Sequence, residues 1–341
     1  MCLGGENATI ILDNEGWNVL KMFFSTFHFD YPYDQVPVFN IGDYIQAIAA
    51  TRFLPRVDFT IDRDSISSFN SKAIGRREIK LIGNSWYSVR REAHTVPDCI
   101  DFLPISVHIN NPKGDILEVL KSWANYGPIG CRDIQTHELI QSHGFDSYFS
   151  SCLTTTLTRE YVLSGERQTS LTRKNVVLVD VYEESPKIRF WQLHKLPQSY
   201  KKASEYSKAI KQLHQLLKHY EGEKIERITH LYPMALNQND RFEIARKLLI
   251  KYASAKLVIT SRIHCALPCL ALGTPVVLMT KKYDELRYRG LYEFLNHIGL
   301  DQNLNLSVDI EFKHGDVINK DTHLAKANNL ISRCNDFVNN K

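Results

Sequence analysis

The sequence has no pair of cysteines of the CxxC type, and this absence argues against the common zinc-binding folds. Seven cysteines are present but scattered along the 341 residues, and Cys265 and Cys269 are four positions apart. A structural zinc site needs two close cysteine pairs, or one pair with nearby histidines. Free thiols in a reducing compartment are therefore expected, and no metal site is predicted.

Long apolar runs are missing as well. No segment reaches the roughly 18 uninterrupted apolar residues that a membrane-spanning helix needs. The opening residues, MCLGGENATIILDNEG, do not show the basic stretch followed by an apolar one that marks a secretory signal. We therefore expect a cytoplasmic protein, for which peripheral contact with the inner face of a membrane is the remaining form of membrane association.

A strong charge of one sign is also absent. The 42 lysines and arginines are nearly balanced by 38 aspartates and glutamates, and the formal net charge is +4. No basic run carries interleaved aromatic residues, so the sequence does not indicate nucleic-acid binding. The mild positive charge suits an anionic small substrate or a weak attraction to an acidic membrane surface.

The chain is longer than one hydrophobic core usually supports. Single cores stop growing at about 250 to 300 residues, so two domains are predicted. Short apolar runs alternate with amphipathic stretches in two successive series, and each series predicts parallel βαβ units. The predicted fold is α/β, with two facing Rossmann-like domains and a cleft between them.

The polar segment 158–175 separates the two series and is the predicted linker. The predicted domains are then residues 1–157 and 176–341. The polar C-terminal tail can pack back against the rest of the chain. In the first series, strands are predicted at 8–13, 78–83, 105–109, 127–133 and 148–157, and helices at 42–54, 115–126 and 134–144. In the second, strands are predicted at 176–181, 228–233, 256–261 and 275–279, and helices at 199–220, 240–255 and 291–299.

An arginine and a histidine interrupt the apolar segment TSRIHCALPCLALGTPVVLM at residues 260–279. A parallel strand that ends at Ser261 directs the following helix N-terminus to the cleft, where its N–H groups and dipole favour anions. Arg262 adds a fork of donors for carboxylate or phosphate, and His264 can exchange a proton near neutral pH. The pattern also fits a satisfied core histidine and an arginine paired with an acid, and both interpretations stay open.

Polar residues follow two other predicted strands. The segment NIGDYIQ places Asn40 and Asp43 at a strand-to-helix turn, either in the cleft or as helix caps. The segment GNSWYS places Asn84 and Trp86 after another strand, where they suit contact with a sugar but equally fit ordinary loop anchors. We therefore treat these four residues as candidates for the acceptor side of the cleft.

Arginines stand at two further turns. GPIGCRD places Arg132 beside Asp133, and KKYDELRYRGL places Arg287 and Arg289 after the last strand of the second series. An arginine next to an aspartate often forms an ion pair or accompanies a helix cap, and a charged loop is often only solvated. The local pattern leaves open whether Arg132 and Arg289 reach the cleft.

Taken in order, the segments NIGDYIQ, GPIGCRD, YFSSCLTTTL, SRIHCALPCLALGTPVV and DELRYRGL resemble the polysaccharide pyruvyl transferase family across residues 38–298. SRIHCAL is the most specific of them. The resemblance implies a GT-B-like fold, no cofactor, and phosphoenolpyruvate as co-substrate. It also implies a product in which pyruvate bridges two hydroxyls of one sugar as a cyclic ketal, within a capsule, an exopolysaccharide or a lipid-linked precursor.

The resemblance also implies roles for individual residues. Arg132 and Arg262, together with Ser261 and Ile263, would hold the anionic donor. His264 would be the residue closest to the chemistry, as an acid, a base or a phosphate ligand. The acceptor sugar and the hydroxyls that are bridged are not identified by these residues.

Two other functions fit the predicted fold. A GT-B glycosyltransferase that uses a nucleotide sugar would carry an acidic residue five positions before the glycine of GTPVV, where Pro268 stands. A sugar-binding relative without catalytic activity is the second alternative, because a fold alone does not specify chemistry. The joint presence of Arg132, Arg262 and His264 argues against this second alternative.

Overall fold

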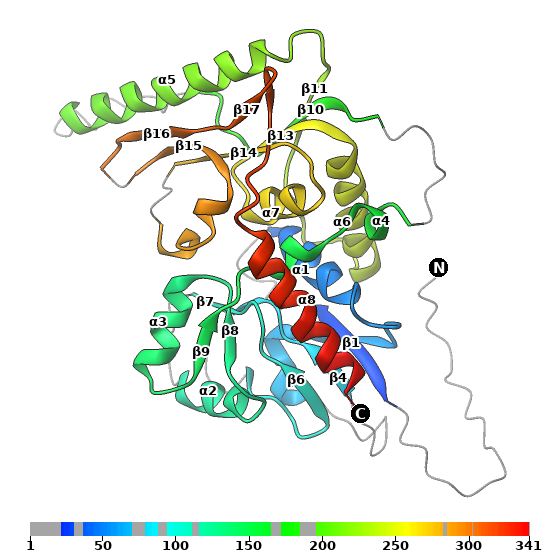
Figure 1. Ribbon diagram of the computed structural model, residues 1–341. Helices are drawn as coiled ribbons and strands as arrows, with labels where there is room; N and C mark the ends of the chain where they lie inside the picture. Colours follow the sequence, from blue (N-terminus) through cyan, green and yellow to red (C-terminus); the bar gives the residue numbers. More distant parts are fainter. Residues whose placement is uncertain are drawn as a thin grey trace, which may run out of the picture.

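Two mainly parallel β-sheets, one in each half of the chain, form the framework of the molecule (Figure 1). The structure is a computed structural model, and the residues that it describes are 22–30, 37–69, 79–87, 94–110, 116–164, 172–184, 196–281, 285–301 and 303–340. The strand expected at 8–13 lies outside these residues.

The N-terminal sheet has four parallel strands in the order β3-β1-β4-β6. Their bounds are β1 Phe23–His28, β3 Phe59–Asp62, β4 Ile79–Ile82 and β6 Ile100–Leu103. Two short parallel pairs follow, made by β5 Trp86–Tyr87 with β7 His108–Ile109 and by β8 Ile129–Cys131 with β9 Ser147–Phe149. The main helices of this half are α1 Gly42–Thr51, α2 Ile116–Ala124 and α3 Ile134–Ser142.

The C-terminal sheet has six strands in the order β11-β10-β13-β14-β15-β16, and β16 runs antiparallel to β15 while the other five are parallel. The strands are β10 Lys174–Val179, β11 Ile225–Ile228, β13 Ala255–Thr260, β14 Val276–Thr280, β15 Asn296–Leu300 and β16 Leu306–Asp309. The helices around them are α5 Leu196–Lys218, α6 Gln238–Ser254 and α7 Ile263–Ala271.

Both sheets have a point where the strand order reverses beside the first strand. In the C-terminal sheet, β10 lies between β11 and β13, and in the N-terminal sheet β1 lies between β3 and β4. In open parallel sheets, ligands bind in the crevice outside the carboxyl ends of the strands at such a point. The residues that follow β10 and β13 are therefore the natural place to look for a site.

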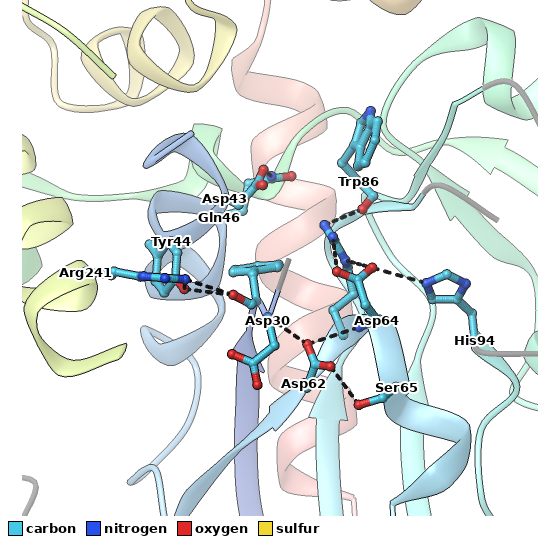
Figure 2. Close-up of polar contacts among 12 residues, drawn as sticks. Asp30, Asp43, Tyr44, Gln46, Asp62, Asp64, Ser65, Trp86, His94 and Arg241 are labelled. Carbon is cyan, nitrogen blue, oxygen red and sulfur yellow. Dashed lines mark hydrogen bonds and ion pairs between the residues drawn. The ribbon is translucent and has the colours of Figure 1, made fainter. Parts of the chain in front are cut away.

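The two halves are joined by shared elements rather than by a single linker. Strand β2 (Val38–Asn40) of the first half pairs antiparallel with β12 (Leu231–Pro233) of the second, and the backbone N–H of Ile41 donates to the His230 carbonyl at 2.9 Å. The buried Arg241 of α6 donates to the Phe29 carbonyl at 3.0 Å and lies beside Tyr44 (Figure 2). The relative position of the two sheets is therefore held by hydrogen bonds and by packing.

The C-terminal helix α8 (Leu324–Asn339) leaves the second half and lies along the first (Figure 1). The ammonium group of the buried Lys80 in β4 donates to the carbonyls of Phe337 at 2.5 Å and Asn340 at 2.7 Å. These bonds satisfy the last carbonyls of α8, which have no partner within the helix. None of the described helices is long and apolar enough to cross a membrane.

The predicted α/β class with two Rossmann-like domains is confirmed by this topology, but four segments differ from the prediction. The strand expected at 228–233 is two strands, β11 and β12, which belong to different sheets. The strand expected at 148–157 ends at Phe149 and continues as a 3₁₀ turn, Leu153–Thr156. The segment 158–175, expected to be a linker, contains the short helix α4 (Arg159–Val162) and the start of β10.

The largest difference concerns residues 291–299, which were expected to form a helix. They form a 3₁₀ turn (Tyr292–Phe294) followed by the strand β15, whose five residues are all buried. A strand buried on both faces shows no alternation of apolar and polar residues, so its pattern does not distinguish it from a buried helix. In the structure, β15 pairs with β14 on one side and with β16 on the other, and the pattern of residues 291–299 alone does not contain these pairings.

Candidate active site

A cavity of about 430 Å³ lies where the two halves of the chain meet. It opens beside the carboxyl ends of β10 and β13, where the strand order reverses. Residues from both halves form its walls, and they include eight of the residues predicted from the sequence: Asn40, Asp43, Trp86, Arg132, Ser261, Arg262, Ile263 and His264. The fold therefore brings these residues together around one space.

The wall contributed by the second half is the turn between β13 and α7. Arg262 is the extended residue before the helix, and its backbone N–H donates to the Thr260 hydroxyl at 2.9 Å. The Ser261 hydroxyl donates to the Asp180 carbonyl at 2.8 Å, which ties this turn to the end of β10. The first N–H groups of an α-helix have no partner within the helix, and the start of α7 at Ile263 lines the cavity, so these groups can be offered to an anion there.

The guanidinium of Arg262 has an acidic partner. Its Nε donates to Oδ2 of Asp180 at 2.7 Å, and the Arg262 side chain is 31% exposed. Burial by itself would raise the pKa of Asp180, but hydrogen bonds from the His230 backbone, Thr229 and Arg262 lower it below its ordinary value. Asp180 is therefore a stable anion that holds one edge of Arg262, while the rest of the guanidinium lines the cavity.

His264 lies on the first turn of α7 and is buried, with 6% of its surface exposed. Nη1 of Arg132 lies 3.4 Å from its Nε2. Because a guanidinium can only donate, Nε2 is the acceptor and the neutral ring carries its proton on Nδ1. Burial, followed by the positive charge of Arg132, holds the pKa of His264 well below its ordinary value, so the ring is neutral.

Gly42 permits the close approach of α1 to this histidine. A Cβ atom at Gly42 would lie 3.0 Å from Cβ of His264 and 3.1 Å from both its Nδ1 and Oδ1 of Asn40. The same Asn40 oxygen accepts the Gly42 backbone N–H at 3.0 Å. Any larger residue at position 42 would push the two walls of the cavity apart.

Arg132 and Asp133 form the corner of the opposite wall, and both are buried. Asp133 caps α3 by accepting the Thr136 backbone N–H at 3.0 Å, and its Oδ2 lies 3.4 Å from Nε of Arg132. The sequence left open whether this pair is an ion pair or a helix cap, and the structure shows that Asp133 serves in both. Arg132 keeps Nη1 directed at His264, so its charge is also available to the cavity.

The sequence did not single out His108, which lines the same cavity. Its Nδ1 lies 2.6 Å from Oδ2 of Asp133, and the ring is 2% exposed. Burial and the positive charge of Arg132 lower its pKa to about 4, against the opposing effect of Asp133. The only feature of the sequence that could have indicated His108 as a site residue is its place as a polar residue inside the apolar strand ISVHI, directly before the carboxyl end of that strand.

Two predicted residues do not line the cavity. Asn84 is buried, and its Nδ2 donates to the Gln46 carbonyl of α1 at 2.9 Å, so it joins the end of β4 to a helix instead. Arg289 is exposed and forms two hydrogen bonds with Glu138 of α3, at 2.7 and 2.8 Å. Arg287, two positions earlier, is the arginine of this loop that lines the cavity.

Trp86 and Asp43 complete the wall of the first half. The Trp86 carbonyl accepts a hydrogen bond from the buried Arg63 at 2.7 Å, and Arg63 is held in turn by Asp64 (Figure 2). The backbone of Trp86 is therefore held by Arg63, and Trp86 lines the cavity. Asp43 contributes a carboxylate to the lining of the cavity. Its Oδ1 accepts a hydrogen bond from Nε2 of Gln46 at 3.3 Å.

The cavity has the electrostatics of an anion site. Three arginines, at positions 132, 262 and 287, line it together with one carboxylate, Asp43. One group of potential metal ligands occurs among the described residues, His28, Asp30 and Asp62, and it lies outside the lining. Asp62 is there as the cap of a 3₁₀ turn. The arrangement can bind a small multiply charged anion and place two neutral imidazole rings beside it.

The chain resembles two solved structures at low sequence identity. An uncharacterised protein from Klebsiella pneumoniae subsp. pneumoniae is 14% identical over 79% of this chain and 86% of its own, with a TM-score of 0.36. A UDP-GlcNAc 2-epimerase from Methanocaldococcus jannaschii, solved with UDP-GlcNAc and UDP, is 10% identical over 94% of this chain and 92% of its own, with a TM-score of 0.35. Both scores are too low to support a conclusion about this chain. No curated protein sequence matches it.

A family match is more informative. The family model described as polysaccharide pyruvyl transferase matches residues 40–282, which is more than half of the 341 residues. The matched range contains Arg132, Arg262 and His264, which the structure brings to one cavity. The resemblance predicted from the motifs is confirmed, and the chain belongs to the polysaccharide pyruvyl transferase family.

Proposed function

We propose that the protein transfers the enolpyruvyl group of phosphoenolpyruvate to a sugar and closes it to a cyclic pyruvate ketal. The acceptor is a sugar of a surface polysaccharide, capsular or exopolysaccharide, or of its lipid-linked precursor. The observation that carries this proposal is the grouping of Arg132, Arg262 and Arg287 with neutral His264 in one cavity. Its volume, about 430 Å³, lies within the range of about 300 to 1,000 Å³ that is typical of small-molecule sites.

The donor carries a carboxylate and a phosphate, and the cavity offers matching groups. The start of α7, at Ile263, supplies N–H groups and the positive end of the helix dipole. Arg262 extends from the same turn, and Arg132 approaches from the opposite wall. Arginine binds such oxygens with two parallel hydrogen bonds, so it fixes orientation as well as charge.

The reaction forms two bonds between C2 of the donor and sugar oxygens, and it breaks the bond between C2 and the phosphate oxygen. Two hydroxyl protons are released, of which one goes to the methylene carbon and the other leaves on hydrogen phosphate. His264 is neutral, so it can accept a hydroxyl proton. Binding of the negatively charged donor raises its pKa, because nearby negative charge favours the protonated ring, and the ring can then deliver that proton.

No cofactor takes part in this scheme, in which phosphoenolpyruvate is a co-substrate. The donor is a cytoplasmic metabolite, so the reaction is proposed to take place in the cytoplasm. It would occur at the inner face of the membrane when the acceptor is lipid-linked. The net charge of +4 allows a weak peripheral contact with an acidic membrane there.

The test is phosphate release from phosphoenolpyruvate by the purified protein, with a panel of free sugars and lipid-linked fragments. We expect release that depends on the acceptor, and a product whose mass equals acceptor plus pyruvic acid minus water. Turnover of a nucleotide sugar in place of phosphoenolpyruvate would contradict the proposal. Binding of sugar without release of phosphate would leave a non-catalytic relative as the better description.

A further inference from the structure

His108 has the geometry of an oriented proton acceptor. Its Nδ1 faces Oδ2 of Asp133 at 2.6 Å, and since a carboxylate only accepts, Nδ1 carries the proton. Nε2 is then the unprotonated nitrogen of a ring that lines the cavity. The Asp133 carboxylate is held in this orientation because its Oδ1 accepts the backbone N–H and the hydroxyl of Thr136 at 3.0 and 2.9 Å.

Two arginines and a second histidine interact electrostatically with this pair. Arg132 lies on the same corner, with Nε 3.4 Å from Oδ2 of Asp133. Arg287, in the 3₁₀ turn after β14, acts on His108 through its positive charge, and His264 of α7 is close enough to interact with it electrostatically. Burial, together with the positive charges of Arg132 and Arg287, keeps the His108 ring neutral at rest, which is the state that a proton acceptor needs.

The stoichiometry of ketal formation requires two proton transfers, whereas the residues discussed so far supply one acceptor. The first transfer moves a hydroxyl proton to the methylene carbon and leaves a tetrahedral intermediate that still carries phosphate. In the second, another hydroxyl forms the second bond to C2 while the bond from C2 to the phosphate oxygen breaks. The proton of that hydroxyl must reach the departing phosphate.

We propose that His108, oriented by Asp133, is a second catalytic residue, whose Nε2 takes the proton of the ring-closing hydroxyl and passes it to the leaving phosphate. This inference rests on the proposed function, because it assigns one of the two transfers of that reaction. His264, which contacts the donor-side arginine Arg132, serves the first transfer. After hydrogen phosphate has left, both rings are neutral again and no proton has been exchanged with solvent.

The experiment measures the two transfers separately. In heavy water, reversal of the first transfer places deuterium in the methylene group of recovered phosphoenolpyruvate, and the second transfer is measured as phosphate release. We expect His108→Gln to keep the deuterium exchange and to lower phosphate release by at least about 100-fold. His264→Gln should lose both, and His137→Gln, on α3 but outside the cavity lining, should keep both at the wild-type rates.

Asp133→Asn is the second variant, and it tests the role of His108 independently if His108→Gln does not fold. Asparagine still caps a helix, so α3 is retained. Its amide donates to Nδ1 of His108 and leaves the proton on Nε2, which then cannot accept. This variant should therefore also keep the exchange and lose phosphate release.

The outcomes separate the two proposals. Wild-type protein that releases no phosphate from phosphoenolpyruvate with any acceptor overturns the proposed function, and the role of His108 with it. Wild-type release together with unchanged release by folded His108→Gln or Asp133→Asn overturns the role of His108 alone. Loss of both exchange and release in these variants, at unchanged donor affinity, also overturns it, because the first transfer would then need His108.

Discussion

The two walls of the cavity are built in different ways. The wall of the second half is one short segment, in which Ser261, Arg262 and His264 follow each other at the turn from β13 into α7. The wall of the first half gathers side chains from separate elements, among them Trp86 of β5 and His108 of β7. A continuous segment has its geometry encoded locally, whereas a gathered wall exists only once the sheet has formed. The comparison predicts that the wall of the second half holds the donor together with Arg132 from the opposite wall, and that the remaining residues of the wall of the first half position the acceptor.

The largest effect is expected at His264, where the two walls meet. His264→Ala removes the proton-transferring ring but leaves Arg132 and Arg262 in place, so the turnover number should fall by about 100- to 10,000-fold. The Michaelis constant for phosphoenolpyruvate should stay close to the wild-type value. Steady-state rates together with calorimetric titration of the donor measure the two quantities. Loss of donor binding in a folded variant would make the histidine a phosphate ligand instead.

Arg262→Ala should have the next largest effect, and chiefly on binding. A hydrogen bond to a charged group contributes about 1.5 to 3 kcal/mol, so the Michaelis constant for phosphoenolpyruvate should rise by about 10- to 100-fold at a nearly unchanged turnover number. Arg262→Lys should restore only part of this, because an ammonium does not make the two-pronged contact.

The partner of Arg262 supplies the control. Arg262→Ala leaves the Asp180 carboxylate without the hydrogen bond that it accepts at 2.7 Å, and this charge would repel the donor by itself. The double variant Arg262→Ala, Asp180→Asn removes that repulsion. If it binds the donor as tightly as the wild type, Arg262 only neutralises Asp180 and does not contact the donor.

The buried histidines also predict how stability depends on pH. The pKa of His108 is about 4 in the folded protein, below the value of about 6.5 of an unfolded chain, so unfolding takes up a proton between these values. His264 shifts in the same direction. The free energy of unfolding should therefore be fully present above about pH 6.5 and should fall by about 1.4 kcal/mol per pH unit and per histidine as the pH drops towards 4.

Urea unfolding at about pH 7.5 and about pH 5 measures this loss. His108→Gln carries no titratable ring at position 108, so its stability should change less between the two pH values than that of the wild type. Equal stability of the wild type at both pH values would show that neither ring is held neutral, and the proton-transfer roles would lose their basis.

The smallest effect is expected at Arg289. Its partner Glu138 is exposed, and an exposed ion pair contributes little to stability, so Arg289→Ala should lower stability only slightly and leave the Michaelis constant for the donor unchanged. Arg287→Ala, two positions away, should raise that constant, because this arginine lines the cavity. If both variants changed the Michaelis constant for the donor equally, the loop would attract the donor only through its total positive charge, and the position of Arg287 would not matter.

The wall of the second half could be predicted from the sequence, because an apolar strand, a turn with Ser261 and Arg262 and an apolar helix specify one another within a few residues. Asn40 and Arg132 were candidates as polar residues at strand ends, but the local pattern left open whether they reach the cleft, and the family resemblance supplied the donor role of Arg132. These local patterns also carried the family resemblance, and they gave the α/β class without any knowledge of the strand order.

His108 could not be predicted in this way. It lies in the apolar strand ISVHI, and the partner that gives it a role, Asp133, is 25 positions away in the sequence. Asn84 and Arg289 were candidates because they follow predicted strands, but each turns to a nearby helix, to Gln46 of α1 and Glu138 of α3. Which way a side chain points at a strand end depends on the neighbouring strands and helices, and the local pattern does not contain them.

The central claim is that both walls bind one donor molecule, and calorimetric titration of phosphoenolpyruvate into wild-type protein and into Arg132→Ala tests it most directly. Arg132 belongs to the first half, 2% exposed, and directs Nη1 at His264 of the second half. We predict one binding site per chain in the wild type and a loss of affinity of at least about 10-fold in the variant, since a buried charged contact contributes about 2 kcal/mol or more. Wild-type affinity in folded Arg132→Ala, or no binding of phosphoenolpyruvate to the wild type, would contradict the account.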